Sequence, residues 1–290
     1  YSGGFLAEVE LDQFNHTRMQ MGLMSEHFSY QLLDGESLIA PEVMMSFSAN
    51  GLSKLSHNFQ KCIGEHICRG KYKNEIRPIL VNSWEASYFD ISKDSIIGLS
   101  KDAAELGVEM LVMDDGWFGD KYPRRTDKTS LGDWVVDRKK LPSGIGGLLE
   151  NARKNGVKFG IWIEPEMANT TSELYEKHPD WILKAPNREL VLGRGGTQVV
   201  LDLANPKVQD FIFGIVDNLM TNYPEIDYIK WDANMSIMNH GSNYLSDNDQ
   251  SHMYIAYHKG FETICQRIRA KYPEVTIQAC ASGGGRVNYG

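Results

Sequence analysis

The chain has 290 residues, 42% of them hydrophobic and 23% charged, which is the composition of a globular protein with a large core. Its formal net charge of −8 argues against nucleic acid or an anionic membrane as the main partner. No apolar run reaches transmembrane length, and four cysteines without C-x-x-C spacing disfavour a zinc site and a disulfide framework. We therefore expect a cytoplasmic protein with no membrane partner.

The first fifty residues have the pattern of β-structure. Phe5–Leu11 alternates apolar and polar side chains, and Thr17–Met21 and Phe28–Leu32 follow, separated by turn-forming residues. These strands are too few for a complete sandwich, so we interpret residues 1–50 as the C-terminal part of an N-terminal β-sandwich domain. Apolar residues at helical spacing follow, and we assign residues 51–76 to a helical linker.

From residue 77 onward, strand and helix patterns alternate. The predicted strands are 79–84, 110–115, 158–164, 199–203, 228–234 and 275–281. Six such units imply a parallel sheet with right-handed crossovers, either a doubly wound sheet or a (β/α)₈ barrel. A long loop follows the second strand, and its basic cluster, Lys121–Lys128, is interpreted as solvated.

Nearly every predicted strand ends in polar or aromatic side chains. These ends are Asn82-Ser-Trp84, Asp114-Asp-Gly-Trp117, Trp162-Ile-Glu-Pro-Glu166, Lys230-Trp-Asp-Ala-Asn234 and Cys280-Ala-Ser-Gly-Gly-Gly-Arg286. A barrel gathers all its strand ends at one mouth, whereas a doubly wound sheet concentrates its ligand at one switch point. We therefore favour an α/β fold, a (β/α)₈ TIM-type barrel with about six of its units in residues 77–290, truncated before its last strands.

The fifth predicted strand carries the first candidate site. If 228–234 is a strand, Lys230, Asp232 and Asn234 share one face. The Lys230 cation would lower the pKa of the Asp232 carboxyl and keep it charged, so that Asp232 could act as a nucleophile. The alternative is a solvated ion pair at the end of an edge strand. The polar and aromatic side chains at the other strand ends disfavour this alternative.

The pooled strand ends suit a sugar, because ring faces of tryptophans pack on C–H groups while carboxylates accept hydrogen bonds from hydroxyls. They bring four tryptophans to this predicted pocket, namely Trp84, Trp117, Trp162 and Trp231. Asp114 and Asp115 could hold two neighbouring hydroxyls, with hydrogen bonds contributing roughly 1.5–3 kcal/mol each. A helix cap and an exposed turn acid are the alternative. Glu164 and Glu166 could form a general acid/base pair, although Pro165 between them favours a rigid strand exit.

No cofactor and no metal are predicted. The glycine-rich stretches Gly193–Gly196 and Ser282–Arg286 lack the spacing of a phosphate loop or a dinucleotide fingerprint. None of the eight histidines has metal-ligand spacing.

Six ordered motifs carry a resemblance to a known family. They are Asn82–Ala86, Met113–Gly119, Leu131–Trp134, Gly160–Met167, Lys230–Asn234 and Cys280–Arg286. This series resembles that of glycoside hydrolase family 36, the bacterial α-galactosidases. The resemblance covers residues 77–290, and the β-segment before them resembles the end of that family's N-terminal sandwich.

The resemblance implies roles for single residues. Asp232 matches the catalytic nucleophile, and the substrate-binding matches are Asp114, Asp115, Trp162, Arg194, Lys230, Asn234, Cys280 and Gly283. It implies a retaining α-galactosidase that hydrolyses terminal α-galactosyl residues of melibiose- and raffinose-type oligosaccharides without a cofactor. Galactose-containing oligosaccharides are then the partners, and a homo-oligomer is implied for the full-length protein.

A retaining glycosidase also needs a second carboxyl about 5–5.5 Å from the nucleophile. In the family this acid/base follows the glycine-rich motif, so the resemblance implies that it lies beyond residue 290 with the last two barrel strands. Three other functions stay open. They are galactoside binding without turnover, galactosyl transfer by the same family, and a scaffold, which the strand-end acids and tryptophans disfavour.

Overall fold

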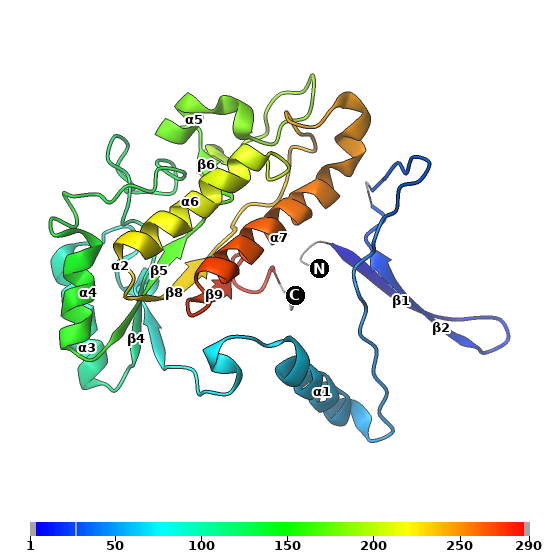
Figure 1. The fold of residues 1–290 in the computed structure, drawn as a ribbon, viewed down its shortest axis with the longest axis horizontal. Coiled ribbons are helices and arrows are strands. Elements are labelled where there is room, and N and C mark those ends of the chain that lie inside the picture. The colour runs from blue at the N-terminus through cyan, green and yellow to red at the C-terminus, as the bar shows by residue number, and fades with distance from the viewer. Residues whose placement is uncertain (1–3, 27, 287–290) are drawn as a thin grey trace.

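The computed structural model describes residues 4–26 and 28–286, and a parallel sheet dominates it (Figure 1). In this part of the chain the sheet has five strands, in the order β3 (Leu80–Asn82), β4 (Met110–Met113), β5 (Lys158–Ile163), β8 (Ile226–Trp231) and β9 (Thr276–Ala279). The spatial order follows the chain order without reversal, as in a barrel and unlike a doubly wound sheet. The predicted TIM-type barrel is confirmed as a partial barrel.

Helices connect these strands and cover the sheet. They are α2 (Trp84–Ser87), α3 (Lys93–Glu105), α4 (Gly144–Lys154), α5 (Glu173–Lys177), α6 (Pro206–Asn222) and α7 (Met253–Lys271). The sequence sets their starts. Ser92 and Ser95 form a capping box on α3, and the Asn205 side chain accepts the Lys207 N–H before Pro206 opens α6. α6 and α7 lie side by side across the sheet (Figure 1).

The predicted fourth barrel strand is wrong in its placement. Residues 198–200 do form a strand, β7 (Gln198–Val200), but it pairs antiparallel with β6 (Met167–Asn169) in a separate sheet. β5 pairs directly with β8 instead. A short buried apolar run predicts a strand without specifying its partner, and here the chain turns away from the barrel sheet after β5.

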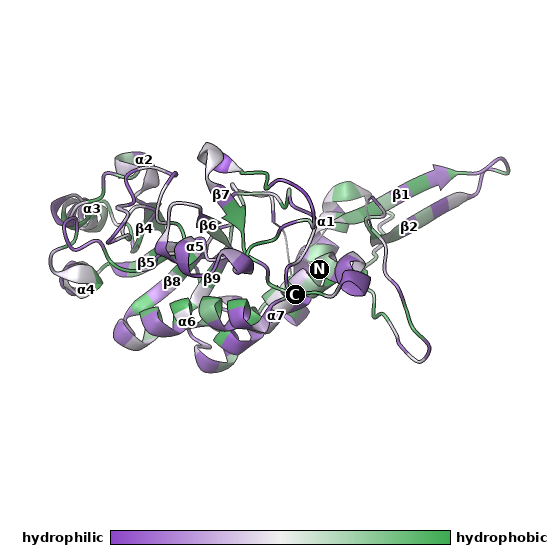
Figure 2. Ribbon diagram, turned by 90° about the horizontal axis from the view of Figure 1, so that it is seen from above, coloured by the Kyte–Doolittle hydropathy of each residue, from purple (hydrophilic) through white to green (hydrophobic). Residues whose placement is uncertain are grey.

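The N-terminal segment contains a hairpin and a helix. β1 (Phe5–Leu11) and β2 (Thr17–Leu23) pair antiparallel, and Figure 2 shows them projecting away from the barrel. α1 (Gly51–Cys62) continues into one π-helical turn, Ile63–Ile67. The hairpin and this helix agree with the sequence prediction.

The strand predicted at Phe28–Leu32 is wrong. The described residues of this segment have no regular structure, and they pack against the start of α7 instead of a neighbouring strand. The Tyr30 ring stacks on His252 at 4.0 Å, and the Gln31 N–H lies 3.2 Å from His252 Nε2. A strand needs a partner for its backbone, and here a histidine side chain takes that place.

The core lies between the sheet and its helices. Leu111, Ile161 and Ile229, on three adjacent strands, are fully buried there with the apolar faces of α4 and α6. This packing fixes the directions of the strands and therefore the positions of the side chains that follow them. Within residues 4–26 and 28–286, no helix is both long and apolar enough to cross a membrane.

Candidate active site

The carboxyl ends of the five parallel strands meet at one edge of the sheet. Asn82 ends β3, Asp114 follows β4, Trp162 lies near the end of β5, Lys230 lies near the end of β8, and Cys280 follows β9. Register pairs Trp162 with Lys230, which places these two side chains at the same level of the sheet. The structure therefore brings the predicted strand ends together, as a barrel mouth does.

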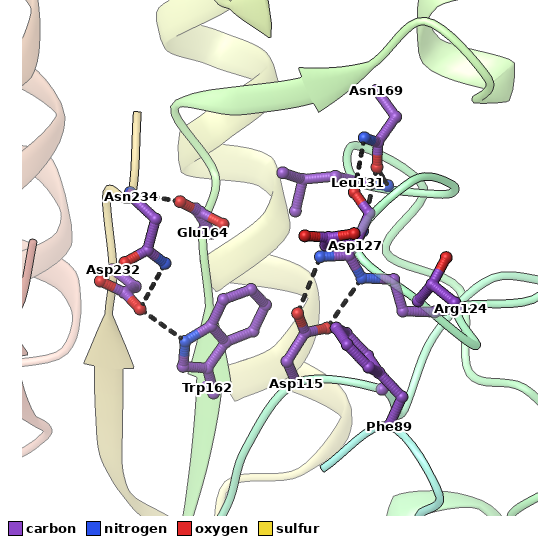
Figure 3. Close-up of polar contacts among 12 residues, drawn as sticks. Phe89, Asp115, Arg124, Asp127, Leu131, Trp162, Glu164, Asn169, Asp232 and Asn234 are labelled. Carbon is purple, nitrogen blue, oxygen red and sulfur yellow. Dashed lines mark hydrogen bonds and ion pairs between the residues drawn. The ribbon is translucent and has the colours of Figure 1, made fainter. Parts of the chain in front are cut away.

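Asp232 follows β8 directly, and Figure 3 shows its carboxylate beside the Trp162 indole and the Asn234 amide. Its backbone N–H donates to the Ile163 carbonyl at 2.8 Å, which extends the pairing of β8 with β5 by one residue. Its Oδ2 accepts the indole N–H of Trp162 at 3.1 Å and the side-chain amide of Asn234 at 2.7 Å, while Oδ1 accepts the Ala233 N–H at 3.0 Å. The carboxylate is buried and held by donors from two strands.

These donors determine the charge of Asp232. Burial raises the pKa of its carboxyl, but hydrogen bonds from Asn234, Trp162 and the Cys280 thiol outweigh burial and bring the pKa below its usual value. The predicted ionised state agrees with this direction, although the hydrogen bonds are the largest causes that lower this pKa. Lys230 Nζ forms its ion pair with Asp114 Oδ2 at 2.8 Å, and its charge also interacts with that of Asp232.

Asp114 forms an ion pair that crosses the sheet. Its Oδ2 accepts Lys230 Nζ at 2.8 Å and Asn82 Nδ2 at 2.6 Å, and its Oδ1 accepts the Asp115 N–H at 2.9 Å. Burial lowers the pKa of Lys230, yet the Asp114 carboxylate more than compensates and raises it. Asp114 is thus not a helix cap, and its carboxylate stays at the mouth of the sheet.

Asp115 has a partner that the sequence prediction missed. Arg124 Nε and Nη2 bond its two carboxylate oxygens at 2.9 and 2.7 Å (Figure 3), and the Arg124 side chain is 2% exposed. Burial raises the pKa of the Asp115 carboxyl, and the guanidinium opposes that rise. The interpretation of Lys121–Lys128 as a solvated loop is therefore wrong for Arg124. A run of cationic residues in the sequence does not indicate that one of them pairs with a carboxylate nine residues earlier.

Lys140 holds the loops around this pair. Its Nζ donates to the carbonyl oxygens of Phe89, Gly116 and Arg124 at 2.7, 2.8 and 2.7 Å. Burial lowers the pKa of this ammonium group. Three backbone segments that meet beside Asp115 are thus tied to one cation, which no sequence motif indicates.

Glu164 and Glu166 have different surroundings, although both are buried. Glu164 Oε1 accepts the backbone N–H of Asn234, and Gln198 Nε2 lies 3.4 Å from its Oε2. Burial raises the pKa of Glu164 to about 8, against the opposing hydrogen bond from Asn234. The Asp232 charge acts in the same direction as burial.

Glu166 is instead surrounded by strong donors. Trp231 Nε1 and Arg286 Nη1 bond its Oε1 at 2.8 and 2.7 Å, and the Tyr257 hydroxyl bonds its Oε2 at 2.6 Å. Both oxygens are engaged within the protein, which makes Glu166 an anchor between β8, α7 and the loop after β9. The hypothesis that Glu164 and Glu166 form an acid/base pair gains no support from these contacts.

The four predicted pocket tryptophans separate into two groups. Trp162 directs its indole N–H at Asp232, whereas Trp117 and Trp231 are buried with their N–H groups on the Trp162 carbonyl and Glu166. Trp84 packs edge-on against Tyr88 at 5.2 Å. Strand alternation explains Trp231, because a residue between Lys230 and Asp232 points to the opposite face. The prediction of a four-tryptophan pocket is therefore wrong for Trp117 and Trp231.

Two predicted binding residues lie on loops. Gly283 has a positive φ of 95°, and its backbone hydrogen bonds to Cys280, whose thiol in turn bonds Asp232. Arg194 pairs with Asp127, with Nε 3.4 Å from Oδ2, and its side chain is 45% exposed. Gly283 is thereby linked to the cluster around Asp232, whereas the contacts of Arg194 connect it to Asp127 at the rim.

The described part of the chain contains no group of three or more histidine, cysteine or acidic side chains suited to a metal ion. What the cluster offers is a buried, ionised carboxylate with fixed donors, next to a second carboxylate paired with a lysine. A carboxylate held in this way can act as a nucleophile toward an electrophilic carbon.

Comparison with known proteins identifies the family. The melibiase family model matches residues 37–290. The bifunctional α-galactosidase/sucrose kinase AgaSK of Mediterraneibacter gnavus is 43% identical over the whole chain, and α-galactosidase AgaA of Geobacillus stearothermophilus is 41% identical. The chain spans 30% and 39% of the lengths of these two relatives.

Solved structures agree with this result. The crystal structure of AgaA from Geobacillus stearothermophilus superposes with a TM-score of 0.92 at 40% identity, covering 99% of this chain and 39% of that one. The galactosidase domain of AgaSK superposes with a TM-score of 0.88 at 42% identity, covering 100% and 38%. The chain therefore belongs to the melibiase family, glycoside hydrolase family 36.

Proposed function

We propose that this chain supplies the nucleophile and galactose-binding residues of a retaining α-galactosidase. The observation that carries the proposal is the Asp232 carboxylate, whose pKa is lowered by donors from Asn234, Trp162 and Cys280 at the mouth of the sheet. A lowered pKa keeps the nucleophile charged at neutral pH. The α-galactosidase names of the relatives support the same activity.

The reaction is a double displacement. A carboxylate oxygen of Asp232 forms a bond to the anomeric carbon while the glycosidic C–O bond breaks, and the leaving oxygen takes a proton from a second carboxyl group. Water then attacks the anomeric carbon and gives its proton to that second group, while the bond to Asp232 breaks. The donors on Asp232 also stabilise it as the leaving carboxylate in this second step.

The galactose lies against the residues that surround Asp232. In this proposal Asp114 and Asp115 accept hydrogen bonds from the sugar hydroxyls, and Lys230 and Asn234 contact the sugar beside the nucleophile. Trp162 provides a wall, Cys280 and Gly283 line the opposite side, and Arg194 approaches from its loop. Because Asp114 is already fixed by Lys230 and Asn82, its orientation need not change on binding.

Raffinose- and melibiose-type oligosaccharides are the proposed substrates. Structures of AgaA in complex with stachyose and with raffinose support this choice. We also propose the division into residues 1–50 as the end of a β-sandwich, 51–76 as a helical linker and 77–290 as the barrel. The projecting hairpin and the change to parallel strands support it.

The test uses the full-length protein and two chromogenic substrates, the aryl α-galactoside and its 4-epimer, the aryl α-glucoside. We expect turnover of the galactoside alone, and its loss in the Asp232→Asn variant. The Asp114→Asn variant should lose discrimination as well as rate, since a charged acceptor contributes roughly 1.5–3 kcal/mol per hydrogen bond. Equal turnover of both substrates, or an active Asp232→Asn variant, would overturn the proposal.

A further inference from the structure

Glu164 is a buried carboxyl group, and among the described residues no cation is in direct contact with it. Its side chain makes one hydrogen bond with the backbone N–H of Asn234 and one long contact with Gln198, at 3.4 Å. Arg124 is the cation that influences it, but that guanidinium is bonded to Asp115 and Asn169. Burying an ionised carboxylate without a partner is strongly unfavourable, so the neutral acid is the form that this site accommodates.

Glu166, two residues later, is a built-in comparison. It is equally buried, yet Arg286, Tyr257 and Trp231 all donate to it at 2.6 to 2.8 Å. The chain thus surrounds one of two neighbouring carboxyls with a guanidinium and two further donors, and leaves the other with a single firm donor. This difference in partners points to different protonation states for the two side chains.

Gln198 offers a place for the proton. Its Oε1 is buried and has no hydrogen-bond partner in the described part of the chain, and its amide faces Glu164 Oε2. The two orientations of a side-chain amide have the same shape. With the amide turned over, Oε1 faces the Glu164 carboxyl and accepts its O–H, while Glu164 Oε1 continues to accept the Asn234 N–H.

The contacts of Asn234 connect Glu164 to the nucleophile. The Asn234 side-chain N–H donates to Asp232 Oδ2 at 2.7 Å, and its side-chain oxygen accepts Ser282 N–H and O–H at 3.0 and 2.8 Å. Asn234 lies beyond the end of β8, where no strand pairing fixes its backbone. The Glu164 carboxyl, directly after the end of β5, supplies that fixed point (Figure 3).

We propose that Glu164 is a positioning residue that works as a neutral carboxylic acid, holding the Asn234 backbone so that the Asn234 amide points at the Asp232 nucleophile. This inference rests on the proposed function of Asp232. The charged groups that act on Glu164 are Asp232, Asp115 and Arg124. The two carboxylates favour its neutral form, and Arg124 opposes them from its place on Asp115.

The first test measures protonation without any catalysis. Infrared difference spectra at pH 7 separate the carbonyl stretch of a neutral carboxylic acid from that of a carboxylate. We expect a buried neutral-acid band that is absent in E164Q and unchanged in E166Q, the matched control. If E164Q shows the same neutral-acid bands as wild type, the proposal is wrong, whether or not the protein hydrolyses galactosides.

The second test measures positioning on an aryl α-galactoside whose leaving group needs no protonation, using the full-length protein. E164A should lose roughly 10- to 100-fold in kcat, since a small misplacement of a group at the active site has that effect. E164Q, whose amide is a neutral isostere of the carboxylic acid, should keep the rate that E164A loses. In wild type, kcat/KM should fall as pH rises through a pKa of about 8, and this fall should be missing in E164Q.

The outcomes separate the two proposals. If E164Q is as impaired as E164A, or keeps the step in its pH profile, the neutral-acid role of Glu164 is wrong while the galactosidase activity of wild type stands. If wild type does not hydrolyse the substrate, the proposed function is wrong, and the infrared comparison still decides the protonation of Glu164. Circular dichroism identifies any variant that fails to fold.

Discussion

The side-chain amide of Asn234 lies 2.7 Å from Oδ2 of Asp232, so two residues on one short segment form a donor and acceptor pair. This pair stands at the meeting point of β5, β8 and the loop after β9, because Trp162 and Ser282 bond its two members from either side. The charge of Asp232, the proposed nucleophile, therefore depends on hydrogen bonds at the strand ends, and it can be changed by removing them one at a time.

Removing the Asn234 amide should raise the pKa of Asp232. In Asn234→Ala one of the hydrogen bonds that lower this pKa is lost, so the Asp232 carboxylate becomes protonated at a higher pH. We expect the acid limb of kcat/KM to move upward and the rate at neutral pH to fall by about tenfold or more. Asn222→Ala, on the exposed face of α6, is the matched control and should leave the profile in place. An unchanged acid limb in Asn234→Ala would show that Asn234 does not control the charge of Asp232.

Arg124 should contribute to stability far more than its neighbour. Arg124→Met leaves the Asp115 carboxylate buried without its bidentate partner, and breaking such a pair reduces the free energy of unfolding by about 3–5 kcal/mol. Arg125→Met removes an exposed arginine and should change it little. Urea unfolding measures both, and adding Asp115→Asn to Arg124→Met should recover part of the loss. Equal effects of the two arginine variants would contradict the buried pair.

Two glycines in neighbouring helices should respond oppositely to alanine. A Cβ on Gly260 of α7 would meet the Leu203 carbonyl oxygen at 2.0 Å, whereas a Cβ on Gly214 of α6 meets nothing within 4 Å. Gly260→Ala should therefore lower the melting temperature. Gly214→Ala should raise it, since alanine favours a helix over glycine by about 0.8–1.0 kcal/mol. A neutral Gly260→Ala would mean that α7 lies farther from Leu203 than the structure places it.

The pH dependence of stability should reveal Glu164. Its pKa of about 8 exceeds the ordinary value of 4.5, so between these two pH values the folded state holds a proton that the unfolded state releases. Its contribution to the free energy of unfolding therefore falls as pH rises through this window, by up to about 1.4 kcal/mol per pH unit, and levels off above pH 8. Urea unfolding of wild type and Glu164→Gln across this range should show a steeper fall in wild type, because other carboxyls with raised pKa values, such as Asp115, titrate in both proteins. Parallel curves for the two proteins would contradict a raised pKa.

The sequence predicted most of what depends on local pattern. The barrel strands follow apolar runs, and Asn205 with Pro206 starts α6 where the capping rule places it. The pairing of strands that lie apart in the sequence was harder to predict. The apolar run that forms β7 is a strand as predicted, but its antiparallel partner β6 could not be inferred from periodicity. Phe28–Leu32 alternates like a strand, yet it packs on His252.

The candidate site shows the same limit at the level of single residues. The positions of Asp232, Asp114 and Lys230 at strand ends predict that they belong to one site, and the structure brings them together. Their connections were not predicted, because Lys230 pairs with Asp114 across 116 residues of sequence instead of with Asp232 two residues away. In the sequence Arg124 is one more cation in a charged loop, and its burial against Asp115 is a feature of the folded structure. Ion-pair partners and burial are properties of the folded chain.

The most direct test of the central claim is to identify the residue that becomes covalently attached to the sugar. The full-length protein is incubated with an activated fluorinated α-galactoside, whose leaving group needs no protonation, and is then digested and mapped by mass spectrometry. We predict one hexosyl-type adduct on the peptide that contains Asp232, and its absence in Asp232→Asn. An adduct on another carboxylate, or none on a folded and galactoside-hydrolysing protein, would contradict the assignment of Asp232 as the nucleophile.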